Sequence, residues 1–335
     1  MIRRIARTIL PGPIRRVLGR AAWEVQYAPT RANRVLRRAA RRVLMSNERL
    51  FLWTYKRTSR LPAPGRARVP SRFPEEEDHQ IEAVVNELRQ NGVAIWRGLF
   101  ADPQLLEDVR STLDQGFARW EAIFREREDS CPEVFDPETR WKFHRGTKQV
   151  YDMDRRTRIY YSLDNTPPAI RRLMDDPRFR EVACRYYQVD AGPCGYILGE
   201  KLSPSPVGDS WHVDRIRDQF KAMILLSDVG LEQGPLKYKQ GTHQKPPPKI
   251  DHFFYQYFRS GVEWCYVSPP LGDSAPGEVK LALGRAGDCV FFDTTGLHSG
   301  TRCQAGERLA LVFGFTEPPT FRNQFFSHME GGMHI

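Results

Sequence analysis

The sequence predicts an α+β fold in which helices flank a β-barrel or jelly-roll core. Three observations predict this fold class. Apolar residues recur at helical spacing between residues 81 and 187. After residue 194 the pattern changes to short β-rich runs separated by turns, without a helical period. The 335 residues are enough for one large domain and an extension, and helices followed by many short strands are typical of an α+β plan.

Residues 1–70 form a basic leader that differs from the rest of the chain. They hold 18 Lys and Arg residues against two acidic ones, whereas the remainder holds 33 basic and 39 acidic residues. Within the leader, residues 34–44 combine an apolar stripe at helical spacing with arginines on the other face. Prolines and a glycine in residues 61–70 favour a linker. We therefore expect a basic amphipathic N-terminal extension and linker over 1–70 and one folded domain over 71–335.

Several interpretations of this leader stay open. A basic amphipathic helix is typical of peripheral binding to an anionic membrane, which is the interpretation we favour. Such a helix also suits packing on the acidic domain or on a partner, and an Arg-rich, acid-poor segment also fits an organellar transit peptide. No motif of a nucleic-acid module is present, so we expect no specific nucleic-acid partner. Arginines interrupt every apolar run, which argues against a secretory signal.

The six cysteines and the leader together bear on the compartment. No two cysteines form a CxxC pair, so neither zinc-finger spacing nor a disulfide framework is predicted. We expect reduced thiols in a cytoplasmic protein, with peripheral association at the inner membrane surface as an extension of that expectation.

The first half of the domain is predicted to be mainly helical. Helices are expected over residues 81–89, 103–120, 166–174 and 179–187, with one strand over 93–96. Thr166 is expected to cap the third helix, because prolines that a first turn tolerates follow it. Residues 129–158 are expected to be irregular and charged.

The second half is predicted to consist of strands and turns. Strands are expected over residues 194–201, around 212–214, and over 221–227, 289–293 and 309–313. An insertion over 244–279 carries seven aromatic residues and interrupts this core. It is interpreted either as a helix that packs on the barrel or as a lid over the substrate, since long insertions on small barrels are usually functional.

His212 and Asp214 are the centre of the predicted site. Their spacing places both side chains on one face if the stretch is a strand. A second imidazole, from the remote His298, would complete a two-histidine, one-carboxylate triad, which leaves coordination positions open and suits non-haem Fe(II). The alternative is a chance HxD triplet of surface polar residues.

The motifs in this order resemble the phytanoyl-CoA dioxygenase family of Fe(II)- and 2-oxoglutarate-dependent oxygenases, over roughly residues 80 to 316. His212, Asp214 and His298 fall on the HxD…H metal triad of the family, and Arg308 falls on its 2-oxoglutarate-binding arginine. Residues 234–243 look like the turn that precedes the distal histidine strand, although Gln and Thr replace the usual Pro and Ser. Residues 91–98 resemble the first strand of the family.

The resemblance implies a double-stranded β-helix (a jelly roll, cupin-like) with Fe(II), 2-oxoglutarate and O2 as cofactor and cosubstrates. It implies hydroxylation of an unactivated C–H bond, with no catalytic residue beyond the metal site. Ser299 or Thr301 would assist Arg308, and Lys148 would reach the cosubstrate by a loose analogy of position. Asp214 occupies the carboxylate position that related halogenases lack, which argues against halogenation.

The expected substrate is a small molecule or a lipid-linked molecule, and the sequence does not select one. Candidate substrate contacts are Tyr196, Leu198, Trp211, Tyr255 and Trp264. The alternative function is a non-catalytic metal-binding jelly-roll protein whose basic leader binds a membrane or a partner.

Overall fold

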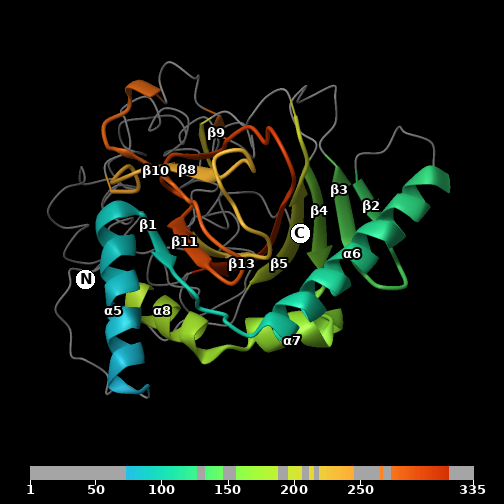
Figure 1. The fold of residues 1–335 in the computed structure, drawn as a ribbon, viewed down its shortest axis with the longest axis horizontal. Helices are drawn as coiled ribbons and strands as arrows, with labels where there is room; N and C mark the ends of the chain where they lie inside the picture. The colour runs from blue at the N-terminus through green and yellow to red at the C-terminus, as the bar shows by residue number, and fades with distance from the viewer. Residues whose placement is uncertain are drawn as a thin grey trace, which may run out of the picture. The chain divides into compact units, whose positions relative to one another are not determined.

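The computed structural model describes the greater part of the chain after the basic leader. Its described residues are 73–126, 133–145, 156–187, 195–205, 211–214, 219–244, 265–266 and 273–316. The expectations for residues 1–70, for most of the 244–279 insertion and for Lys148 lie outside these ranges. Within them, two antiparallel sheets and a few helices form a jelly-roll-like architecture (Figure 1).

The larger sheet has eight strands, and each strand runs antiparallel to its neighbours. In spatial order they are β1 (Val93–Trp96), β11 (Cys289–Asp293), β7 (Gln219–Leu225), β13 (Arg308–Thr316), β5 (Tyr196–Leu202), β4 (Arg156–Tyr161), β3 (Lys142–Arg145) and β2 (Glu133–Phe135). Strands from both ends of the domain thus meet in this sheet.

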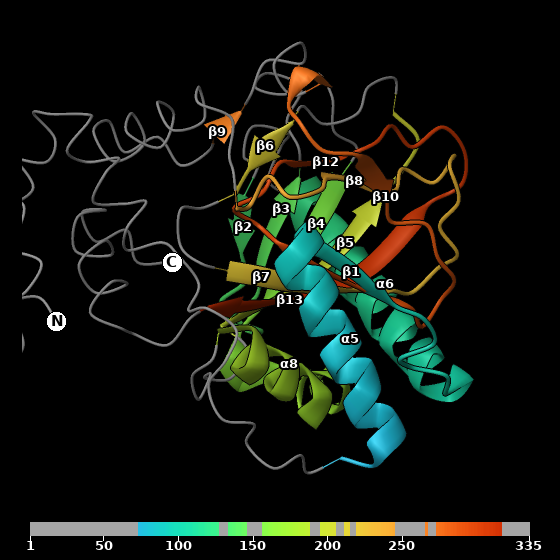
Figure 2. The ribbon, with the colours of Figure 1, turned by 90° about the vertical axis from the view of Figure 1, so that its left-hand side faces the viewer.

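The smaller sheet has five antiparallel strands and carries the predicted metal ligands. Its spatial order is β10 (Val279–Leu281), β8 (Leu236–Lys239), β12 (His298–Gly300), β6 (His212–Val213) and β9 (Cys265–Tyr266). In Figure 2 its strands lie above β7 and β13 of the larger sheet, and helix α8 lies below them.

Within the described residues, four helices accompany the sheets: α5 (Glu75–Asn91), α6 (Pro103–Glu126), α7 (Pro168–Met174) and α8 (Pro177–Tyr187), with a 3-10 turn η1 (Leu163–Asn165) before α7. Four acidic residues in the first turn of α5 complement its dipole. Gly92 ends α5 with a φ of 81°, a left-handed conformation that favours glycine. Among the described residues, no helix is long and apolar enough to cross a membrane.

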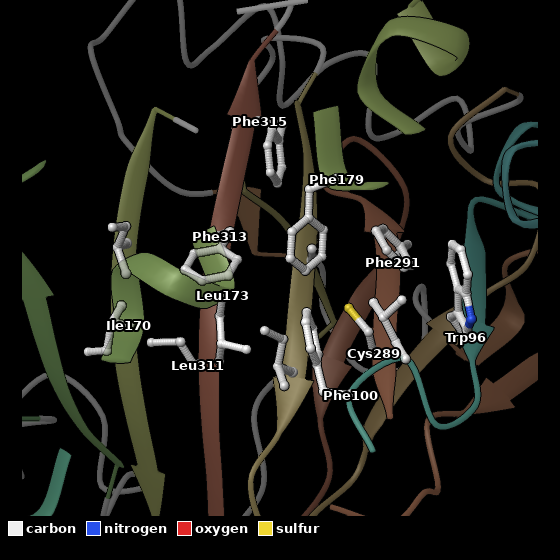
Figure 3. Close-up of a cluster of buried hydrophobic side chains, with 14 of the residues drawn as sticks. Trp96, Phe100, Ile170, Leu173, Phe179, Cys289, Phe291, Leu311, Phe313 and Phe315 are labelled. Atoms are coloured by element: carbon white, nitrogen blue, oxygen red, sulfur yellow. The ribbon is translucent and has the colours of Figure 1, made fainter. Parts of the chain in front are cut away.

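The central strands β11, β7 and β13 of the large sheet bury side chains on both faces, and successive side chains alternate between the helix layer and the smaller sheet. On β7, Phe220, Ala222 and Ile224 join the cluster under the helices, whereas Met223 and Leu225 join the cluster between the two sheets. On the helix side, Phe179 of α8 lies among rings from β11 and β13 (Figure 3). Polar residues of β7 and β13 that share the inner face, such as Lys221 and Arg308, therefore point toward the space between the sheets.

Two expectations for the first half of the domain are wrong. Residues 129–158 contain β2, β3 and the start of β4, which extend the large sheet by pairing in sequence next to β5. Val134, Phe143 and Ile159 lie opposite one another in the register and are buried, while Lys142 and Arg158 lie on the other face of these strands. Thr166 does not cap α7, because its hydroxyl donates to the Ser162 carbonyl and Pro167 holds the N-cap position.

Candidate metal centre

Two neighbouring strands bring the three predicted ligands together. His298 of β12 lies directly opposite His212 of β6 in the antiparallel register, and Asp214 follows β6. Asp214 Oδ1 lies 3.5 Å from His212 Nε2 and 3.4 Å from His298 Nε2. One ligand atom from each residue falls within 4.8 Å of the others. Two imidazoles and a carboxylate at this separation fit a single divalent ion, and the donor set is the one that Fe(II) oxygenase sites use.

Backbone contacts orient two of these side chains. His298 Nδ1 lies 2.9 Å from the Gly296 carbonyl, which can only accept, so Nδ1 carries the proton and Nε2 presents its lone pair to the site. Asp214 N–H donates to the Thr294 carbonyl over 3.0 Å. Both partners belong to the short turn between β11 and β12, so this turn sets the position of ligands from two strands.

The buried carboxylate of Asp293 stabilises the turn between β11 and β12. Asp293 Oδ1 accepts hydrogen bonds from the backbone and hydroxyl of Thr295, and Asp293 Oδ2 accepts one from the Tyr186 hydroxyl over 2.5 Å. The Tyr238 hydroxyl donates to the Asp293 carbonyl over 2.9 Å, and its ring stacks on His298 at 6.3 Å. Helix α8 therefore supports the metal ligands through Tyr186 and Asp293.

Replacing Tyr186 with Phe should weaken metal binding by about tenfold, because partners that orient ligands typically contribute 10–100-fold to metal affinity. The matched control is Tyr187→Phe, since the buried Tyr187 hydroxyl donates to the Phe315 carbonyl and not to the turn. Both variants should lose about 1 kcal/mol or more of unfolding free energy. Mn(II) titration of the two purified variants separates the effects, and equal Mn(II) affinities would contradict the bracing role of Tyr186.

Lys221 of β7 is the residue of this site that the sequence did not reveal. Its ammonium pairs with Asp214 Oδ2. Burial raises the pKa of the Asp214 carboxyl, but Lys221 and His298 outweigh burial and hold that pKa well below its usual range. Burial also lowers the pKa of His298, which favours the neutral imidazole that a metal requires. The one signal in the sequence was a lysine at an inward position of an otherwise apolar strand.

Arg308 lies at the start of β13, with 2% of its surface exposed. Its Nη2 donates to Glu200 Oε1 and its Nη1 to the Gly234 carbonyl, each over 2.5 Å. Glu200 also pairs with Arg158 at 3.0 Å and with Arg156 at 3.6 Å. Burial raises the pKa of Glu200, but the three guanidinium groups outweigh burial and keep this carboxyl ionised. Glu200 and its two β4 arginines were not predicted from the sequence.

The hydroxyl residues that were expected to assist Arg308 have backbone partners. Ser299 is fully buried and its hydroxyl donates to the Gly300 carbonyl over 3.1 Å. Thr301 donates to the Pro235 carbonyl over 2.8 Å. Lys148 lies outside the described residues.

The candidate substrate residues occupy different surroundings. Tyr196 lies on the inner face of β5 near Lys221, and burial raises its pKa to about 12 although the charge of Lys221 opposes this. Leu198 packs in the cluster between the sheets. Trp211 is buried, its indole donates to Asp273 Oδ1 over 2.7 Å, and the Lys237 ammonium lies 4.3 Å from its ring centroid. Tyr255 and Trp264 lie outside the described residues.

Comparison with known proteins yields similarity in structure alone. No protein-family model matches the sequence. No curated protein matches it either. Among solved structures, the epimerase SnoN in complex with Fe3+, alpha ketoglutarate and nogalamycin RO is 16% identical, with a TM-score of 0.51 over 72% of this chain and 84% of SnoN.

Two further solved structures give lower TM-scores. AviO1 from Streptomyces viridochromogenes Tue57 is 18% identical, with a TM-score of 0.49 over 71% of this chain and 96% of its own. HygX from Streptomyces hygroscopicus, with nickel and 2-oxoglutarate bound, is 19% identical, with a TM-score of 0.45 over 74% of this chain and 88% of its own. At an identity of 16%, the similarity to SnoN shows a shared fold and no more.

Proposed function

We propose that this protein is an Fe(II)- and 2-oxoglutarate-dependent oxygenase that resembles the phytanoyl-CoA dioxygenase type and hydroxylates an unactivated C–H bond of a small molecule. The observation that carries the proposal is the convergence of His212 Nε2, Asp214 Oδ1 and His298 Nε2 within 4.8 Å. The fold shared with SnoN, whose structure holds Fe3+ and alpha ketoglutarate, supports it. Bound Fe(II), with 2-oxoglutarate and O2, would supply the oxidising power that breaks a C–H bond.

The chain's own residues prepare the site for this chemistry. The two imidazoles and the ionised carboxylate provide three ligand atoms, and a facial arrangement of three leaves positions for the cosubstrates. His298 and Asp214 are buried, with 3% and 7% of their surfaces exposed, so bulk water has little access to that side of the site. Low exposure also strengthens the electrostatic contacts that hold ligands in place.

Arg308 is proposed to bind the far carboxylate of 2-oxoglutarate, since a planar guanidinium pairs with a carboxylate through two parallel hydrogen bonds. Its present partner is Glu200, so the cosubstrate has to share or replace that contact. Arg156 and Arg158 also pair with Glu200 and can keep it ionised when Arg308 turns to the ligand. These two arginines would thereby make Arg308 available.

Replacing Arg308 with Ala should raise the apparent dissociation constant for 2-oxoglutarate at least tenfold, because each charged hydrogen bond contributes about 1.5–3 kcal/mol. Arg308→Lys should recover only part of the affinity, because the lysine ammonium keeps the positive charge but cannot form the two parallel hydrogen bonds of a planar guanidinium. Anaerobic titration of the Fe(II)-loaded variants with 2-oxoglutarate measures this. Normal affinity in Arg308→Ala would assign the far carboxylate to another cation.

The proposed activity is tested by succinate formation from 2-oxoglutarate in the presence of Fe(II), screened across classes of small molecule. Stimulated succinate release with an oxygen atom added to one compound supports hydroxylation. SnoN is an epimerase, so product analysis has to distinguish an added oxygen from an inverted centre. No succinate from the iron-loaded protein with or without any compound would favour the alternative, a metal-binding protein without turnover. A lipid-linked substrate and a membrane role for residues 1–70 stay predictions.

A further inference from the structure

Lys221 makes the two carboxylate oxygens of the candidate ligand Asp214 unequal. The ammonium binds Oδ2, while Oδ1 faces the Nε2 atoms of His212 and His298. The side chain of Lys221 is 18% exposed and that of Asp214 is 8% exposed, so this pair lies largely away from solvent. One carboxylate oxygen of Asp214 is thus paired with a protein cation.

The neighbouring strands hold Lys221 in this position. On β13, Gly314 lies opposite both Lys221 of β7 and Tyr196 of β5 in the register. A Cβ at Gly314 would lie 1.9 Å from the ring of Tyr196, so the glycine lets this ring lie across β13 toward the lysine. The ring of Phe292 lies 5.9 Å from the ammonium on the other side. The Lys221 side chain therefore lies between the two sheets and is held there by its neighbours.

We propose that Lys221 is a positioning residue of the metal centre: it neutralises Asp214 before the metal binds and, by occupying Oδ2, restricts Asp214 to a single ligand oxygen. The inference rests on the proposed function in taking the three residues as metal ligands. A buried carboxylate without a partner is costly, so the lysine keeps the site folded while it is empty of metal. A carboxylate limited to one oxygen leaves one more position on the metal for the chelating cosubstrate.

The first test uses Mn(II) as the probe and thermal unfolding as a second readout. In Lys221→Met, we expect the metal-free protein to melt at a lower temperature. We also expect the dissociation constant for Mn(II) to fall at least about tenfold, because a positive charge close to the metal has been removed. Lys221→Arg retains the charge and should behave as the wild type. The matched control is Lys280→Met, which removes a partly buried lysine paired with Glu87 instead. Unchanged or weaker Mn(II) binding in Lys221→Met would overturn the counter-ion role.

A double variant keeps this test decisive if Lys221→Met does not fold. Asp214→Asn with Lys221→Met removes both charges, so the metal-free double variant should recover the lost stability. Failure of the double variant to melt above Lys221→Met would show that the lysine acts through packing and not through Asp214, which would also overturn the proposal.

The second test addresses the single ligand oxygen. In the Co(II)-loaded protein without O2, the dissociation constant for 2-oxoglutarate should rise severalfold in Lys221→Met and not in Lys221→Arg, because a freed Oδ2 competes for a coordination position. Equal constants in all three proteins would refute the restriction to one oxygen. The wild type could bind Mn(II) and yet bind no 2-oxoglutarate when it is loaded with Co(II) or with Fe(II). That result would contradict the proposed function, while the comparison of Mn(II) affinities would still test the role of Lys221.

Discussion

Replacing His298 with Ala is expected to abolish stoichiometric metal binding, and with it any iron-dependent turnover of 2-oxoglutarate. The imidazole is 3% exposed, lies opposite His212 and has its Nδ1 fixed by the Gly296 carbonyl, so no neighbouring group can take its place without a shift of β12. Loss of one of three ligands leaves a pair that holds a divalent ion weakly. Metal content after dialysis and the succinate assay measure the two effects.

The same result is expected for His212→Ala and Asp214→Ala, with a difference in stability. Asp214→Ala leaves Lys221 buried beside no carboxylate, and breaking one side of a buried pair costs about 3–5 kcal/mol. Asp214→Asn keeps the shape and is the better variant for metal measurements. The control is His79→Ala, since His79 is an exposed histidine of α5. A variant of the triad that keeps near-native metal content and turnover would remove that residue from the ligand set.

Three strands next to the triad could be predicted because each combines a marked polar residue with an apolar run. The runs after Lys221 and Arg308 appear as β7 and β13, and β11 leads into the turn before His298. The pairing of β6 with β12, which sets the two histidines opposite each other, was not predicted from the sequence. A sequence pattern indicates which side chains share one face of a strand, but it does not indicate which other strand pairs with it.

The residues that sequence analysis missed are those whose role depends on register. Glu200 and Arg158 are charged residues on strands 42 positions apart, and they meet because β4 pairs with β5 at that register. Lys221 is similar, since only the fold shows that it faces Asp214. β2, β3 and β4 were missed because they are short and because charged residues such as Lys142, Arg156 and Arg158 interrupt the apolar alternation that identifies a strand.

Phe179→Ala is expected to lower the free energy of unfolding by about 3–5 kcal/mol, the usual cost of truncating a buried phenylalanine. Phe179 is 1% exposed and packs against four rings at centroid distances of 5.4–6.0 Å, those of Phe100, Phe291, Phe313 and Phe315 (Figure 3). The cavity would open between α8 and the two strands β11 and β13, where rigid sheet backbone limits collapse. Urea denaturation monitored by fluorescence measures the loss.

The matched control is Phe135→Ala, because Phe135 is a phenylalanine of strand β2 that is 56% exposed and should change stability by less than about 1 kcal/mol. Phe179→Leu should lie between the two. Phe179 packs on the helix-side face of the large sheet, whereas the metal ligands belong to the smaller sheet on its other side. The folded fraction of Phe179→Ala should therefore bind Mn(II) with the wild-type dissociation constant. Equal losses for Phe179 and Phe135 would contradict the packing argument. Weakened Mn(II) binding would instead mean that the helix layer sets the geometry of the site through β11, as it does through Tyr186 and Asp293.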